Sequence, residues 1–385
     1  MAAKPRFDGE WVRLGELISK AKSKRCGSEI YPVLSMTMHD GIVEQADRFK
    51  KKIASRDTSS YKVVEPGQLV VGFPIDEGVI YVQNYPYPGI MSPAYNVWDI
   101  NGDLIDPAYL ELVLHGPKSM AYYADKMRGT TARRRSLTAD NLCAMRVPLP
   151  SLERQRRVVH LFNTVKDGMA IAGRVVEALD QLVKSRFAEM FENDSLVERA
   201  QLKDICSLIT DGTHQSPRFQ GEGIPFLFVS NIADNKISYE TTKFISKEDY
   251  EALIARTPIE VGDVLMSAVG SFGHPAIVKD ERPFCFQRHI AYLKPIRERV
   301  NSSFLHAALL SEESQQYMDK AAKGAAQSTV TLRSFKDLAV PLPPLALQQE
   351  FADFAAEVDK SRFIVQQQIE KLQMLYDSLA QEYFS

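Results

Sequence analysis

The stretch Val147-Pro148-Leu149-Pro150 recurs near the end of the chain as Val340-Pro341-Leu342-Pro343. The same offset pairs Gln155 with Gln348 and keeps apolar residues on apolar residues through the segments that follow. A match of four residues alone would be chance, but a match that keeps the same offset through the whole of the following segment is not. The repeat therefore predicts two diverged copies of one structural unit.

A long amphipathic pattern follows each copy of this stretch. Its apolar residues recur at heptad spacing, which is typical of a helix with one broad apolar face. We expect a central helix in residues 151–195, with Ser151 as its N-cap, and a C-terminal helix in residues 345–385. The residues expected on the pairing and partner-docking faces are Val158, Leu161, Val165, Val175, Leu179, Leu182, Phe351, Phe354, Val358, Leu372, Leu375 and Leu379.

These two helices could each pack on the core of its own domain, or they could pair with each other. The apolar stripe is longer than one small domain needs, which favours an antiparallel pair with leftover faces for partner subunits.

The segments ahead of the helices are predicted to be mixed α/β. Short β-like runs are separated by Gly, Pro, Asn and Asp clusters. The runs are residues 68–73, 78–82, 225–229 and 289–293, and helical stretches are expected near Pro107–Leu114 and Ser303–Lys320. The predicted fold class is α+β, with a pseudo-two-fold repeat of two mixed domains in residues 1–150 and 196–344, each followed by one of the long helices.

Composition places the chain among globular proteins. It has 385 residues, of which 45% are hydrophobic and 25% are charged. No signal peptide and no membrane-spanning run is recognised, and the four scattered cysteines are interpreted as packed, reduced thiols of a cytoplasmic protein. The net charge of -2 means that any nucleic-acid surface must come from local clustering.

A search for catalytic motifs argues against an enzyme. The sequence has no phosphate-binding Gly-rich loop, no Asn/Asp-Pro-Pro-aromatic tetrapeptide and no metal-ligand spacing. Asp211 and His214 could form a catalytic pair, with His274 as a further base, but Asp-Gly favours a turn at Asp211-Gly212. We therefore expect no catalytic, cofactor-binding or metal-binding residue in this chain.

Clusters of cations and hydrogen-bond donors lie in the predicted loops. Lys and Arg neutralise phosphates, whereas Arg, Asn, Gln, Ser and Thr also read base edges. Lys50-Lys51-Lys52 is interpreted as a solvated face. The predicted DNA-contact residues are Lys22, Lys24, Arg25, Arg128, Thr130, Arg133, Arg134 and Arg135 in the first copy, and Thr213, His214, Ser271, His274, Gln287, Arg288, Lys323, Gln327 and Ser328 in the second.

Several loose motifs, in order, resemble the specificity subunit of type I restriction-modification systems. Residues 338–345 followed by Gln348-Gln349-Glu350 resemble the family's junction between recognition domain and spacer helix. The other matching segments are residues 211–214, 262–267 and 269–273, and, for a second recognition-domain subtype, residues 67–70 and 89–95. The first junction departs from the pattern, because Arg156-Arg157 follows Gln155 where an acidic residue is common.

The resemblance implies a non-catalytic subunit that binds double-stranded DNA. Each recognition domain would read one half of a split site, and the helices would set the unread gap. Two methylation subunits would dock on the helices and motor-nuclease subunits would join them. S-adenosylmethionine, ATP and Mg would then be bound by those partners, and adenine N6 would be methylated after base flipping. The alternative is a protein-assembly adaptor whose paired helices bind only protein.

Overall fold

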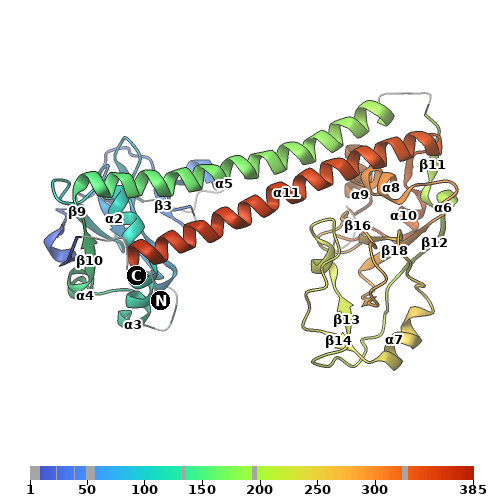
Figure 1. Ribbon diagram of the computed structural model, residues 1–385, viewed down its shortest axis with the longest axis horizontal. Coiled ribbons are helices and arrows are strands. Elements are labelled where there is room, and N and C mark those ends of the chain that lie inside the picture. The colour runs from blue at the N-terminus through green and yellow to red at the C-terminus, as the bar shows by residue number, and fades with distance from the viewer. Residues whose placement is uncertain are drawn as a thin grey trace. The chain divides into compact units, whose positions relative to one another are not determined.

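The computed structural model describes residues 9–22, 24–38, 40–48, 57–129, 131, 135–192, 197–322 and 328–385. The chain forms two compact units, of which unit 1 holds residues 1–172 and 367–385 and unit 2 holds residues 173–366. The two long helices are α5 (Leu152–Phe187) and α11 (Leu345–Phe384) (Figure 1). Each unit therefore contains one part of both long helices.

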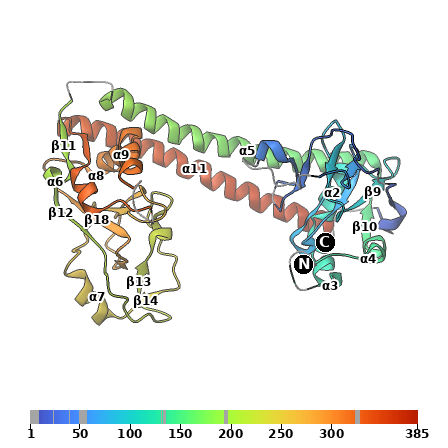
Figure 2. The ribbon, with the colours of Figure 1, turned by 180° about the vertical axis from the view of Figure 1, so that it is seen from behind.

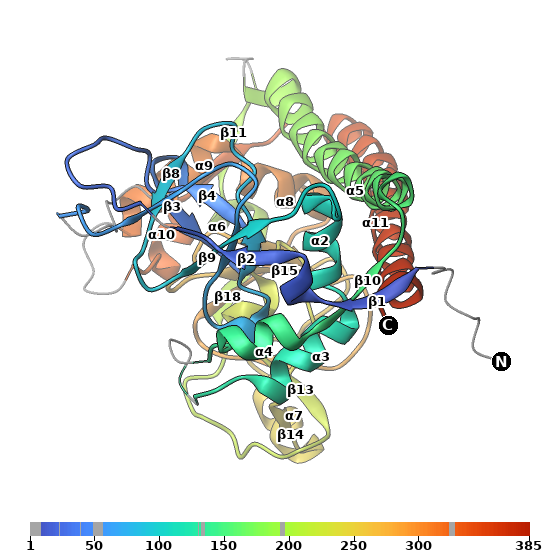
Figure 3. The same cartoon turned by 90° about the vertical axis from the view of Figure 1, so that its left-hand side faces the viewer.

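Unit 1 is built on an antiparallel sheet of order β2-β9-β6-β7. Its strands are β2 (Ile18–Lys20), β9 (Asn96–Ile100), β6 (Leu69–Val71) and β7 (Ile80–Val82). Two-stranded sheets pair β1 (Glu10–Arg13) with β10 (Arg146–Leu149), β3 (Leu34–Met36) with β4 (Ile42–Glu44), and β5 (Lys62–Val64) with β8 (Gly89–Met91). The helices are α1 (Gln45–Arg48), α2 (Pro107–Leu114), α3 (Pro117–Lys126) and α4 (Ala139–Ala144), with 3-10 turns at Leu14–Glu16 and Ile75–Glu77 (Figure 3).

Unit 2 contains two larger sheets. The first is antiparallel, with β12 (Cys206–Asp211), β18 (Ile290–Pro295), β15 (Val264–Ser267) and β16 (Pro275–Ile277) in that order. The second has the order β14 (Phe244–Ile245), β13 (Ile224–Leu227) and β17 (Cys285–Phe286), and β11 (Arg199–Gln201) pairs with β19 (Ala339–Pro341). The helices are α6 (Leu202–Ile205), α7 (Lys247–Ile254), α8 (Ser302–Leu310), α9 (Glu312–Ala322) and α10 (Leu332–Asp337), with a 3-10 turn at Val229–Ile232.

The layers of unit 2 place one sheet away from the helix segments. In both Figure 1 and Figure 2, α8 and α9 lie next to the long-helix segments, whereas β13, β14 and α7 lie at the far end of the unit.

The repeated Val-Pro-Leu-Pro stretch is a strand in each unit. In unit 1, Pro148 of β10 lies opposite Trp11 of β1, and in unit 2, Val340 of β19 lies opposite Ala200 of β11. A two-stranded sheet suits this stretch, because each proline lacks an N–H and is best placed at a sheet edge. The chain turns directly from this strand into α5 or α11.

A buried glutamine at the first turn of each long helix repeats the same three hydrogen bonds. Gln155 donates to the carbonyl oxygens of Leu104 and Pro150 at 3.0 and 2.9 Å and accepts from the Asp106 N–H at 2.7 Å. Asp106 is the N-cap of α2, so this amide joins the start of α5 to the start of α2.

In unit 2 the equivalent amide belongs to Gln348. It donates to the carbonyl oxygens of Arg299 and Pro343 at 3.1 and 2.8 Å and accepts from the N–H of Asn301, the N-cap of α8, at 2.8 Å. Both glutamine side chains have no exposed surface. The predicted repeat is therefore present in the hydrogen bonds as well as in the sequence.

The long-helix segments pack against each other within each unit. In unit 1, the Phe162 ring lies 5.0 Å from that of Tyr376, and a Cβ on Gly168 would lie 3.3 Å from Leu372. Because the partner number falls as the number in α5 rises, the segments are antiparallel.

Unit 2 follows the same rule. The Phe187 ring lies 5.4 Å from that of Phe351, and Arg186 lies 3.7 Å from Glu350. Asp180, which precedes Arg186 in α5, pairs with Arg362, which follows Glu350 in α11. These segments are therefore antiparallel as well.

The residues predicted on the helix faces divide into three groups by exposure. Buried members are Val158, Val165, Phe351, Val358 and Leu379, and half-buried members are Leu161, Leu179, Phe354 and Leu372. Val175, Leu182 and Leu375 are 40%, 47% and 45% exposed, so nearly half of each residue remains outside the packing within the chain. Their role in docking partners stays a prediction.

The predicted strands and helical stretches are present, and one helical stretch is divided in two. Each of the β-like runs contains a strand, Pro107–Leu114 is α2, and Ser151 accepts the Arg154 N–H at 3.4 Å as a helix N-cap. The helix expected at Ser303–Lys320 is two helices, because Ser311 is extended and its hydroxyl accepts the Ser314 N–H, which starts α9 anew. The four cysteines are free thiols, and three are buried. Among the described residues, no helix is long and apolar enough to cross a membrane.

Replacing Gln348 with alanine should destabilise unit 2. The change leaves the Asn301 N–H and two carbonyl oxygens without their partner in a dry site, which costs about 2–4 kcal/mol of unfolding free energy. Urea unfolding of the full chain measures it. The exposed Gln366→Ala on the same helix is the control and should change stability by less than about 0.5 kcal/mol. Equal effects of the two variants would contradict the anchoring role.

Candidate nucleic-acid interface

Thr213 and Gln287, predicted contact residues from distant parts of the sequence, lie side by side in unit 2. The two residues form a parallel bridge, and the Arg288 N–H donates to the Thr213 carbonyl oxygen at 3.0 Å. Gly212 permits this approach, since a Cβ there would lie 2.5 Å from the Gln287 carbonyl oxygen. The turn predicted at Asp211-Gly212 is wrong, because β12 extends to Asp211 and the chain continues through Gly212 to the β-bridge at Thr213. Glycine is needed here because two backbones come into close contact.

A second pair of backbone contacts extends the same surface. The Ala268 N–H donates to the His289 carbonyl oxygen at 2.9 Å, and the Gly270 N–H donates to the Ser328 carbonyl oxygen at 3.0 Å. The loop after β15 therefore joins the Gln287 segment to Ser328. Lys323 and Gln327, which precede Ser328 in the chain, lie outside the described residues.

His214 is exposed and is held by Asp211 at the end of β12. Its Nε2 lies 2.8 Å from Asp211 Oδ2, and Arg256 lies 4.0 Å from the other carboxylate oxygen. The carboxylate thus orients the imidazole at the surface beside Thr213.

His274 and Ser271 are joined in one hydrogen-bonded loop. Ser271 Oγ lies 3.0 Å from His274 Nε2, and Asn235 Oδ1 lies 3.1 Å from His274 Nδ1. Gln315 of α9 donates to the Gly273 carbonyl oxygen at 2.8 Å. These contacts hold the exposed Ser271 in a fixed place, which limits the entropy lost when the loop meets a ligand.

The first basic loop of unit 1 is partly neutralised inside the unit. Arg135 forms ion pairs with Asp76 and Glu77, so its charge is engaged within the fold. Arg128 is exposed, and its backbone pairs with that of Ser136 in an antiparallel β-bridge across the loop. Thr130, Arg133 and Arg134 lie outside the described residues.

The second basic cluster of unit 1 is exposed. Lys24 donates to Glu29 at 2.5 Å, a hydrogen bond that raises the pKa of the ammonium group. The backbones of Arg25 and Lys62 pair in an isolated antiparallel β-bridge. Lys22 is exposed and lies nearby in the chain.

The structure thus brings together the described contact residues of unit 2, but not those of unit 1. Backbone contacts join Thr213, Gln287 and Ser328 through their neighbours, whereas the two basic clusters of unit 1 make no such contact with each other among the described residues. Whether these residues touch DNA stays a prediction.

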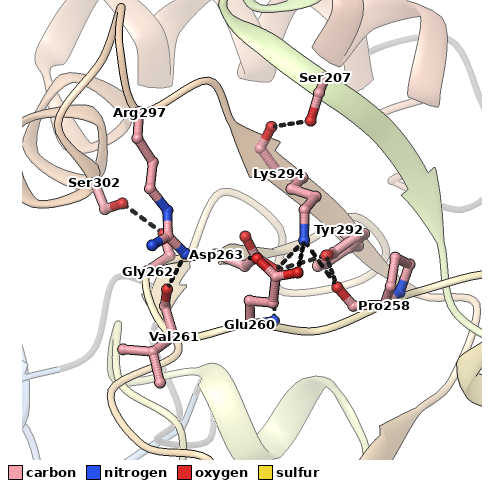
Figure 4. A network of polar contacts seen from close by, with 10 residues as sticks. All are labelled: Ser207, Pro258, Glu260, Val261, Gly262, Asp263, Tyr292, Lys294, Arg297 and Ser302. Atoms are coloured by element: carbon pink, nitrogen blue, oxygen red, sulfur yellow. Dashed lines mark hydrogen bonds and ion pairs between the residues drawn. The ribbon is translucent and has the colours of Figure 1, made fainter.

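A buried carboxylate supports the strands that lead to these loops (Figure 4). Asp263, just before β15, accepts hydrogen bonds from the Tyr292 hydroxyl at 2.6 Å and the Glu260 N–H at 2.7 Å. Lys294 lies 3.7 Å from Asp263 and 3.0 Å from Glu260. Burial raises the pKa of Asp263, while the Tyr292 hydrogen bond lowers it. The network fixes β15 and β18 at the ends away from the loops.

Sequence reasoning missed Asn235, Arg218, Phe219 and Lys243. Asn235 has a positive φ of 57° and orients His274, which no local pattern reveals. Phe219 is 39% exposed and lies with Arg218 in the run Gly212–Gly221, which has no acidic residue. The absence of acidic residues from this run is the sequence feature that could have indicated Arg218 and Phe219 as contact residues.

No cluster of His, Cys, Asp and Glu among the described residues could hold a metal ion.

Residues 195–374 match the family described as type I restriction modification DNA specificity domain. The chain is 22% identical over 381 residues to the type I restriction enzyme MjaVIII specificity subunit of Methanocaldococcus jannaschii, covering 91% of this chain and 86% of that protein. It is 23% identical over 235 residues to the type I restriction enzyme EcoBI specificity subunit of Escherichia coli, covering 53% of this chain and 49% of that protein.

Solved structures of type I systems share this fold. One, from work on complex assembly and conformational transition of the type I R-M system, has 19% identity and a TM-score of 0.63, covering 99% of both chains. The S subunit from M. genitalium has 13% identity and a TM-score of 0.54, covering 100% of this chain and 99% of that one. At such identities the likeness concerns the fold.

These matches confirm the predicted resemblance to type I specificity subunits and the predicted fold class. They also confirm the predicted type of molecule, a non-catalytic subunit for DNA recognition.

Replacing Tyr292 with phenylalanine should destabilise the chain by about 2 kcal/mol at pH 7, because the buried Asp263 carboxylate loses a donor. The loss should shrink as the pH falls through the raised pKa of Asp263 toward its ordinary 3.8, since the protonated carboxyl needs that donor less. Urea unfolding at several pH values measures it.

Tyr239→Phe is the matched control, because its hydroxyl donates to the exposed Asp280 at 3.3 Å. We expect a smaller loss in that variant. A Tyr292→Phe loss that does not change with pH would contradict the role assigned to Asp263.

Proposed function

We propose that this chain is the specificity subunit of a type I restriction-modification complex and that each unit reads one half of a split DNA site. The observation that carries this proposal is the contact between Thr213 and Gln287 in unit 2, which the loop after β15 joins to Ser328. It gathers hydroxyl, amide and guanidinium donors, which are the groups that read base edges and bind phosphates.

Unit 1 would contact DNA through its exposed cations. Arg128 and Arg25 are the strongest candidates, because Arg135 and Lys24 already pair with carboxylates. The two units differ in their polar loops, and we therefore expect two different half-sites. The chain itself would only recognise DNA.

The long helices would set the gap and dock two methylation subunits. Support comes from large apolar side chains that remain exposed on them: Ile171 at 53%, Phe363 at 63%, Ile364 at 55% and Met374 at 62%. Exposed side chains of this size on the long-helix segments of each unit would suit contact with a protein partner. The methylation subunits would bind S-adenosylmethionine and modify adenine N6 after base flipping, and motor-nuclease subunits would bind ATP and Mg. The assembly would act on genomic DNA in the cytoplasm.

Methylome sequencing tests this function. Cells that express the chain with its cognate methylation subunit should carry one bipartite adenine-methylation motif, and cells that lack the chain should not. A continuous motif, or none, would contradict the proposal. Full-chain binding to duplex DNA should also weaken steeply with salt, and the absence of such binding would support the adaptor alternative.

Lengthening both helices in step should lengthen the gap. Four residues inserted in α5 between Val175 and Leu182, with four more in α11 between Arg362 and Gln366, add about 6 Å and a rotation of about 40°. One base pair adds about 3.4 Å and about 34°, so the rotation favours a gap longer by one base pair. Sequencing of the methylated motif should show unchanged half-sites. Altered half-sites would contradict the ruler role.

A further inference from the structure

Phe219 is an exposed aromatic residue in the loop that continues from Thr213 and His214. Its ring lies 5.3 Å from that of Phe226 and 6.3 Å from that of Phe228, both on or next to β13. The neighbouring Gln220 bridges Phe244 of β14, with its N–H donating to the carbonyl oxygen at 2.9 Å. The loop is therefore fastened to the sheet at the far end of unit 2 (Figure 2).

These contacts fix the ring before any ligand arrives. Phe226 is buried and gives the ring an apolar base, and Lys243 lies 5.3 Å from the ring centroid as a cation–π partner. Even so, 39% of Phe219 stays exposed. The fold thus holds an apolar ring at the surface, where it costs little entropy to bind an apolar group.

Two cations lie beside the ring, Lys243 over its face and Arg218 next to it in the chain. Arg218 and Lys243 are both exposed, and within the described part of the chain neither forms an ion pair. The run Gly212–Gly221 contains no acidic residue. A rigid apolar group flanked by free cations matches DNA, in which apolar thymine methyl groups lie in the major groove between rows of phosphates.

We propose that Phe219 contacts the methyl group of a thymine in the half-site read by unit 2, while Arg218 and Lys243 contact the flanking phosphates. This inference rests on the proposed function, because it assigns a specificity-determining residue to the same DNA-binding surface. Deoxyuridine pairs as thymidine does and lacks only that methyl group. Replacing one by the other therefore isolates the contact.

The experiment begins with selection of DNA by the full chain from a pool of randomised duplexes. Each thymine of the selected half-sites is then replaced singly by deoxyuridine, and binding is measured for the wild-type chain and for Phe219→Ala. At one thymine the wild type should bind about fourfold more weakly, the loss expected from one buried methyl or about 0.8 kcal/mol. Phe219→Ala should show no loss at that position, and Phe219→Leu should keep most of it.

Val261→Ala is the matched control, since Val261 is 41% exposed in the same unit and is far from this loop in the sequence. It should keep the full response to deoxyuridine. The inference is overturned if the wild type responds at no thymine, or if Phe219→Ala keeps the response. It is also overturned if Phe219→Ala changes only the binding of a protein partner. If the pool yields no preferred sequence, the proposed function fails as well, which separates the two failures.

Arg218→Gln and Lys243→Gln test the phosphate contacts. Each should make the negative slope of log affinity against log salt less steep by about one, because one counterion fewer is released. Lys247→Gln is the control, since Lys247 lies at the start of α7 and pairs with Glu251 at 3.8 Å. An unchanged slope in both test variants would overturn this part of the inference.

Discussion

The buried glutamine amide at the start of each long helix is the interaction on which the arrangement of each unit depends. Gln155 and Gln348 each fasten three backbone groups: the carbonyl oxygen just before the long helix, a second in the loop ahead of α2 or α8, and the N-cap N–H of that shorter helix. An amide is suited to this place because it donates twice and accepts once without a charge to desolvate. The direction in which each long helix leaves its unit is thereby fixed.

The two ends of unit 2 differ in structure and in the role that we propose for them. Near the helix segments, Phe187, Phe304 and Phe351 form a packed aromatic core. Beyond it, β15 and β18 run from the buried Asp263 network to the loops with exposed donors. Rigid strands that end in polar loops suit recognition, because the loops can differ between relatives while the support is unchanged.

Much of this plan could be predicted from sequence, because it depends on local periodicity. The Val-Pro-Leu-Pro repeat and the heptad pattern after it predicted both long helices, and the equivalence of Gln155 and Gln348 was visible in the repeat. The loop contacts could not be predicted in the same way. Thr213 meets Gln287 through pairing between distant segments, and Arg135 is neutralised by Asp76 and Glu77, which lie far from it in the chain. Such contacts depend on tertiary packing rather than on neighbouring residues.

The central claim is that the two units contact two separate segments of one DNA duplex. Hydroxyl-radical footprinting of the full chain on a duplex that it selects tests this most directly. The account predicts two protected segments with an unprotected gap, and loss of protection in one segment alone when Arg218 and Lys243 are both replaced by glutamine. A single continuous footprint, or equal loss in both segments, would contradict it.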